Sequence, residues 1–506
     1  MKKLIIYIPV VAALIMIGGC KKFLDQKPRT AVATTEFFKS MRDVDAAVAG
    51  MYSSWQREMT NDGGTGFAGQ YFAWGEMRSD NFDDNGQYAS TSFRQLAQNT
   101  LTSGNTSSNW TGLYRTIGRA NTNIRYVPQA SQYDANATPN ALNNALAQCY
   151  AMRAICYFYI VRVWGDAVVW TEPYDDVTKP DQKARSPRDS VINNVILPDL
   201  EKAYSLIPKN QTPVVWNIGE AAICAIAADV MMWKKDYTGA IGWITKLFAA
   251  KGPTGKVFGG TSVNDLELKA DWKSKLFLGP TGSKESIWSI HWDKTYNGCA
   301  CIPVSMGNSN NWGRTDSVIH ADWKKTRTDS IRWAQTIDTL TGLGHQDKLI
   351  KYFNMSGQFN AGTTPATEFN VYLVMYRLAD VYLSLAEAYN GNNDIPNALK
   401  YLNFVRTRPG NPAYLAADPL VSTKAAMENT ILKERQYELF GEGKRWFDLV
   451  RTGKVLDVMD PILKQRQRRI PTAEVGFGID LNKILWPLHR TLLEDNDRLQ
   501  QNPSYN

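Results

Sequence analysis

The sequence has few of the residues and motifs on which enzyme sites usually depend. No H-E-x-x-H zinc motif and no G-x-S-x-G nucleophile motif occurs. The phosphate-loop pattern fails near Lys444, because Glu438 stands where its first glycine belongs. A glycosidase carboxylate pair stays open as an alternative, since 49 acidic residues always offer pairs. The absence of these motifs is weak evidence against catalysis; we expect a binding protein rather than an enzyme, and no cofactor. The four histidines are scattered, at His291, His320, His345 and His489.

Long blocks of charge are also missing, although the formal net charge is +8. No run of five like charges occurs, and glutamines interrupt the densest basic stretch, residues 464–469. Such a stretch is more typical of a solvated surface than of a nucleic-acid site. We expect no nucleic-acid partner.

Cysteine is scarce, with six residues. Cys149 and Cys156 lie seven apart in an apolar segment, so we expect them and Cys224 to be buried as small hydrophobic residues. Cys299 and Cys301 lie in a loop-like region, and their pairing stays open. A zinc site would need C-x-x-C and further ligands, so no metal site is predicted.

The first residues have the pattern of a secretory signal. Lys2 and Lys3 precede an apolar run over residues 4–17, shorter than the roughly 20 residues of a membrane-spanning helix. The following Gly18-Gly19-Cys20 resembles the bacterial lipobox. We predict a signal peptide over residues 1–19 and a lipid anchor at Cys20, and the alternative is a plain signal peptide with an incidental cysteine.

Helical periodicity dominates the rest of the chain. Ser186 and Pro187 predict a helix start, and Pro198 predicts a distortion within that helix. Residues 220–241 and 378–402 look like two copies of one helical hairpin with small residues at the packing face, typical of tetratricopeptide units. Periodic segments cover residues 45–55, 110–124, 141–164 and 186–206.

Two inserts, residues 61–91 and 248–368, are rich in polar loop residues and aromatics. Loops of this length are usually functional. The apolar face of a sugar ring packs on an aromatic side chain, and its hydroxyls need amide, carboxylate or guanidinium partners. We therefore predict an oligosaccharide site on these inserts, with the alternative that their tryptophans fill the core. The predicted ligand-binding residues are Asn81, Trp292, Tyr296, Asn311, Trp312 and Arg314.

The most charged segment, residues 433–448, could suggest an active site. Glu434 and Glu438 share a helix face, with Glu442 one turn on and Arg435 adjacent. Glutamate and arginine on one face are more often structural ion pairs than catalysts. We predict a structural role.

Short motifs in a fixed order along nearly the whole mature chain resemble the SusD/RagB family, the surface lipoproteins of Bacteroidota. The order of the motifs makes the match specific, although each alone is weak. They include Phe23-Leu24-Asp25, Met77-Arg78-Ser79-Asp80-Asn81, Trp164-Gly165-Asp166, Tyr376-Arg377-Leu378-Ala379-Asp380, Arg445-Trp446-Phe447-Asp448-Leu449 and Trp486-Pro487-Leu488.

The resemblance implies an all-α fold in a single domain over residues 20–506, with about four tetratricopeptide-like hairpins and a loop-rich binding face. It also implies an outer-membrane lipoprotein facing the exterior and covering a SusC-like TonB-dependent transporter as a lid. The ligand would be an oligosaccharide, or an oligopeptide as in the RagB branch. Lys21 and Lys22 depart from the acidic residues that often follow the cysteine in surface-exported lipoproteins of these bacteria.

Overall fold

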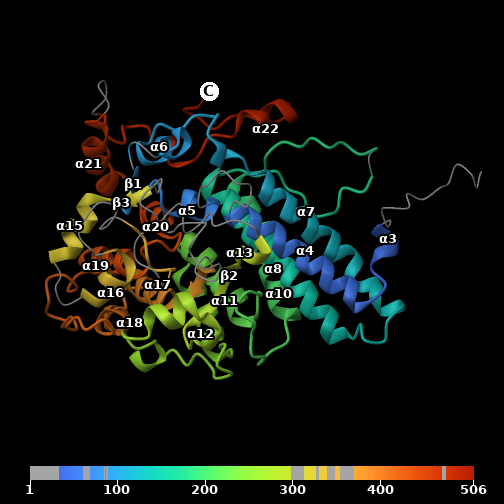
Figure 1. Cartoon of the computed structure of the whole chain (residues 1–506), viewed down its shortest axis with the longest axis horizontal. Coiled ribbons are helices and arrows are strands. Elements are labelled where there is room, and N and C mark those ends of the chain that lie inside the picture. Colours follow the sequence, from blue (N-terminus) through green and yellow to red (C-terminus); the bar gives the residue numbers. More distant parts are fainter. Residues whose placement is uncertain are drawn as a thin grey trace, which may run out of the picture.

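Helices make up most of the chain, with two short sheets among them (Figure 1). The structure is a computed structural model that describes residues 34–60, 69–84, 86, 89–176, 178–297, 313–325, 330–338, 348–353, 370–469 and 475–505. Cys20 and the Cys299–Cys301 pair lie outside these residues. No helix in the described ranges is long and apolar enough to cross a membrane.

The helices of the first half are α3 (Thr34–Phe37), α4 (Met41–Thr60), α5 (Gly69–Gly75), α6 (Thr91–Ala97), α7 (Thr111–Tyr126), α8 (Pro139–Val163), α9 (Arg188–Val191), α10 (Leu197–Leu206), α11 (Glu220–Trp233) and α12 (Tyr237–Ala249). Those of the second half are α13 (Lys294–Asn297), α15 (Ser317–Lys325), α16 (Ser330–Thr336), α17 (Leu378–Gly391), α18 (Ile395–Thr407), α19 (Lys424–Glu438), α20 (Arg445–Arg451), α21 (Val455–Gln467) and α22 (Arg490–Asp495). The strands are β1 (Phe82–Asp84), β2 (Ser286–Trp292), β3 (Gly313–Thr315) and β4 (Val371–Arg377).

The helices pack in pairs, α4 with α7, α8 with α10, α11 with α12 and α17 with α18, and the last two are the hairpins that the sequence predicts. The predicted repeat is visible in the turns of the last two pairs. Lys235 and Asn393 each have a positive φ of about 60°, and the next residue caps the second helix. The Asp236 carboxylate accepts the Gly239 N–H, and Asp394 does the same for Asn397. The all-α, tetratricopeptide-like fold class is confirmed.

The helix after Ser186 is distorted next to its proline, as predicted. It starts as α9, continues as a π-helical turn over Ile192–Ile196 and ends as α10 with Pro198 near its start. Proline has no N–H to donate and crowds the preceding turn, which accounts for the irregularity. The predicted burial of Cys149, Cys156 and Cys224 is also confirmed.

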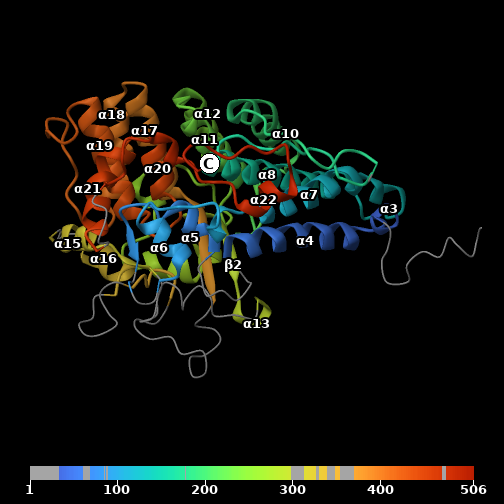
Figure 2. The same ribbon diagram turned by 90° about the horizontal axis from the view of Figure 1, so that it is seen from above.

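Neither sheet was predicted, because each pairs segments that are distant in the chain. β1 pairs antiparallel with β3, and β2 pairs antiparallel with β4, where Trp292 lies opposite Val371. β2 and α13 lie on the opposite side of the molecule from α12 and α18 (Figure 2). β2 therefore lies on the side of the molecule away from α12 and α18 (Figure 2), and it packs against α4.

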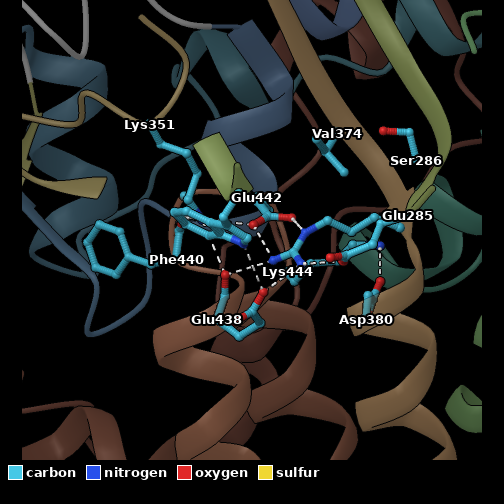
Figure 3. A network of polar contacts seen from close by, with 12 residues as sticks. Glu285, Ser286, Lys351, Val374, Asp380, Glu438, Phe440, Glu442 and Lys444 are labelled. Carbon is cyan, nitrogen blue, oxygen red and sulfur yellow. Dashed lines mark hydrogen bonds and ion pairs between the residues drawn. The ribbon is translucent and has the colours of Figure 1, made fainter. Parts of the chain in front are cut away.

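The charged segment 433–448 is a buried ion-pair cluster, as the sequence predicts (Figure 3). Arg377 on β4 contacts Glu438 at 2.6 Å and Glu442 at 2.8 Å, and Lys351 contacts Glu442 at 2.8 Å. Burial opposes ionisation of Glu438, but the guanidinium groups of Arg408, Arg377 and Arg332 hold its pKa well below the usual range. The cluster joins α19 and the turn after it to β4.

The basic stretch 464–469 is not fully exposed to solvent, although the sequence predicts a solvated segment. Its arginine at position 466 is buried and contacts Asp316 at 2.8 Å, whereas Lys464 and Arg468 are exposed. The stretch ends α21, so one side of the helix faces the interior while the other is solvated. The prediction of a fully solvated segment was wrong for Arg466.

Candidate functional site

A groove of about 330 Å³ lies between α4 and β2, and we call it the aromatic groove. On α4 its wall is a stripe at helical spacings i, i+3, i+4 and i+7. Its lining contains no residue that is charged when the histidine is neutral. The groove is lined by Ala49, Tyr52, Ser53, Trp55, Gln56, Trp216, Asn217, Trp288, Ser289, Ile290 and His291.

Backbone pairing brings the connection before α11 to this groove. The N–H of Ser289 on β2 donates to the carbonyl of Val215 at 2.9 Å, and Trp216 follows directly. β4 pairs with the same strand. The groove therefore depends on three segments that lie far apart in the sequence.

Three rings form a continuous stack at the groove. The centroids of Trp216 and His291 lie 5.5 Å apart at 35°, and those of His291 and Tyr372 lie 4.6 Å apart at 12°. The Trp216 side chain is 38% exposed, a large fraction for an indole in a folded protein. Burial lowers the pKa of His291, although Asp293 opposes the shift, so the imidazole is neutral at neutral pH. The stack offers an apolar, uncharged ring surface.

Three of the groove residues carry a buried polar atom that has no hydrogen-bond partner: Trp55 Nε1, Ser289 Oγ and His291 Nε2. Trp55 and Ser289 are each about 1% exposed. An unsatisfied buried polar group costs about 1–3 kcal/mol and is uncommon in folded proteins. All three atoms are buried, so none of them is open to the groove in this conformation.

The short helix α13 forms the rim beyond β2. The side-chain amide of Asn297 donates to Gln56 Oε1 at 3.0 Å, and its Oδ1 accepts the N–H of Asp293 at 2.8 Å. These bonds fix α13 to α4, next to the groove. Tyr296 on α13 is 88% exposed. Its phenol ring is therefore available to a ligand that extends out of the groove.

The comparisons with known proteins give the family. Residues 338–505 match the model of the SusD family, and residues 22–232 match a SusD-like family described as starch-binding and associating with the outer membrane. The SusD-like protein P38 of Formosa agariphila is 25% identical, with 97% of this chain and 96% of that protein covered. The chain belongs to the SusD/RagB family.

Solved structures of SusD-like proteins have the same fold. A SusD superfamily protein of Bacteroides thetaiotaomicron superposes with a TM-score of 0.70 at 19% identity, covering 92% of this chain and all of that one. A laminarin-binding SusD-like protein gives 0.69 at 19% identity with the same coverage. At this level of identity the agreement concerns the fold.

The predicted ligand residues of this SusD/RagB protein divide into three groups. Tyr296 is exposed on the rim, and Arg314 on β3 is partly exposed and pairs with Asp83 at 3.5 Å. Trp292 is buried within β2 in the core, and Asn81 is buried as well. The other two predicted residues, Asn311 and Trp312, lie outside the described residues.

The position of Asn81 has a structural explanation. Its amide donates to Glu76 at 2.8 Å, and its Oδ1 accepts from Gln436 at 3.0 Å. Trp292 is interior because β2 pairs with β4. Neither side chain reaches a ligand in this conformation, so a ligand role for either stays a prediction that requires rearrangement.

The sequence analysis missed Gln56, Trp216, His291 and Tyr372. The stripe on α4 was the only local pattern that could have indicated the groove, because its polar residues recur at the helical period and so share one face. Trp216 sits in a short connection that resembles any other loop. Among the described residues, no group of three or more histidine, cysteine, aspartate or glutamate side chains could hold a metal ion.

Proposed function

We propose that this protein is an outer-membrane, lipid-anchored binding protein that captures oligosaccharides in the aromatic groove and delivers them to a SusC-like TonB-dependent transporter. The observation that carries the proposal is the partly exposed Trp216 beside His291 at a groove that also presents the polar side chains of Ser53 and Gln56. The indole face of Trp216 would pack against a sugar C–H face, and these polar side chains would bond its hydroxyls.

The lining of the groove favours a neutral sugar over a peptide. Among the described residues its lining holds no carboxylate, lysine or arginine, and the nearby Asp293 could pair only with a peptide amino terminus. One solved relative is named for binding laminarin, and one family model is described as starch-binding, which agrees with a glycan ligand. The missing carboxylates also argue against hydrolysis in the groove, because glycosidases need a carboxylate pair.

Binding is tested by calorimetry on the protein lacking residues 1–20. A panel of neutral plant and microbial oligosaccharides is titrated beside mixed peptides. We expect saturable binding of at least one glycan with a Kd in the micromolar to millimolar range, about −8 to −4 kcal/mol. Product analysis after the titration should show the glycan intact. Binding that is confined to peptides, or release of shorter sugars, would contradict the proposal.

The anchor and the transporter role need a cellular test. Cys20→Ser should remove fatty-acid labelling and release the protein from the outer membrane. Co-purification with a TonB-dependent barrel from native membranes supports delivery. An unlabelled wild-type protein, or one recovered without any such barrel after cross-linking, would contradict this part of the proposal.

A further inference from the structure

A second hollow of about 310 Å³ adjoins the aromatic groove, and we call it the amide hollow. It lies between the first turns of α8 and the connection from α10 to α11. Its lining residues are Asn140, Ala141, Asn144, Gln148, Ile207, Pro208, Gln211, Thr212, Pro213, Val214, Asn217, Ile218, Gly219 and Glu220.

One shared residue and two hydrogen bonds connect the linings of the two spaces. Asn217 lines both, and Trp216 precedes it on the groove side. Tyr52 lines the groove, and its hydroxyl donates to Gln148 Oε1 of the amide hollow at 2.8 Å. The same hydroxyl accepts the Ile218 N–H at 2.7 Å. The two spaces therefore adjoin at Asn217, and the hydrogen bonds of Tyr52 hold their shared border in place.

The chemistry of the amide hollow is specific. Its polar groups are chiefly side-chain amides, each of which can both donate to and accept from a hydroxyl. Glu220 is the only charged residue among the described residues of its lining, and that carboxylate accepts the Asn210 N–H at 3.0 Å. Half-exposed Val214 and the neighbouring prolines add an apolar surface. Because the described lining holds no cation and its one carboxylate would repel an anion, it suits a neutral, hydroxyl-rich ring better than a phosphate or a peptide carboxylate.

We propose that the amide hollow is a second subsite that binds further sugar units of the same neutral glycan chain. This inference rests on the proposed function of the aromatic groove. Each space alone is at the lower end of the roughly 300–1,000 Å³ typical of ligand pockets. Together they match a chain of several units, with Trp216 and Asn217 at the passage between them.

The test is calorimetry with a size series of one neutral glycan, from disaccharide to octasaccharide, on the protein lacking residues 1–20. The double variant Asn144→Ala/Gln211→Ala removes two exposed amides from the amide hollow. We expect wild-type affinity to rise with chain length. The double variant should lose about tenfold affinity for the long members while keeping the wild-type affinity for the short ones. Asn194→Ala, an exposed amide elsewhere, is the matched control and should follow the wild type.

The outcomes separate the two proposals. Equal binding of long chains by the wild type and the double variant overturns the second subsite while leaving the groove in place. Loss of short-chain binding in the double variant, with its circular dichroism unchanged, also overturns it, because the amides would then belong to the first site. Failure of every glycan to bind the wild type overturns both proposals.

Discussion

The Trp216 indole and the His291 imidazole lie with their centroids 5.5 Å apart, although one precedes α11 and the other is on β2. The Tyr372 ring of β4 stacks on the same histidine. Three segments thus build one uncharged ring surface. Trp216 is the exposed end of this stack and the residue on which the ligand proposal depends most.

The buried ion pairs should make a large contribution to stability. Arg377→Met removes the cation that contacts both Glu438 and Glu442 and leaves an excess of buried negative charge, although other cations still contact each carboxylate. We expect the free energy of unfolding to fall by about 3–5 kcal/mol, measured by urea denaturation. Arg188→Met is the matched control, because Arg188 pairs with Asp189 on the surface and should change stability by less than about 1 kcal/mol. Equal effects of the two variants would contradict the account.

Glu76 should make stability depend on pH. Burial raises its pKa to about 7, although Asn81 and the Lys444 N–H oppose the shift. Above about pH 4.5 the unfolded state releases a proton that the folded state still holds on Glu76. The free energy of unfolding therefore falls as the pH rises from about 4.5 to 7. The loss amounts to about 3 kcal/mol at most. Unfolding curves at pH 5, 6.5 and 8 should show this fall, and Glu76→Gln should lack it; parallel profiles would disprove the assignment.

α5 lies so close to the segment after α19 that there is no room for a side chain at Gly75. A Cβ there would lie 2.1 Å from the carbonyl oxygen of Gly443. Gly75→Ala should lower the melting temperature, with a cost of about 1–3 kcal/mol. Gly118→Ala in α7 is the control: its Cβ meets nothing within 4 Å, so alanine should stabilise the helix by about 0.5–1 kcal/mol. A change of melting temperature in the same direction for both variants would contradict this packing.

Much of the fold could be predicted because its information is local. The helical period, the proline at position 198 and the small residues of the two hairpins each act within a few residues. The ion-pair role of Glu434, Glu438 and Glu442 also follows from their spacing on one helix and its continuation. Their partners Arg377 and Arg332 could not be predicted, because they come from distant elements.

The site could be predicted only in part. An aromatic-rich segment indicates rings near a ligand face but does not say which of them pack inward. Trp292 and Tyr296 are four residues apart, yet the first is buried in β2 and the second is exposed on α13. The pairing of β2 with β4 decides this, and it joins segments about 80 residues apart in the chain. Trp216 could not be predicted either, because contacts with a distant segment, β2, place it at the groove.

The most direct test of the account is the affinity of Trp216→Ala for a glycan that the wild-type protein binds, measured by calorimetry on the protein lacking residues 1–20. Tyr133→Ala, an exposed aromatic away from the groove, is the control. The account predicts that Trp216→Ala weakens binding about tenfold or more, about 1.4 kcal/mol, while Tyr133→Ala binds as the wild type does. Unchanged affinity in Trp216→Ala would contradict the aromatic groove as the ligand site.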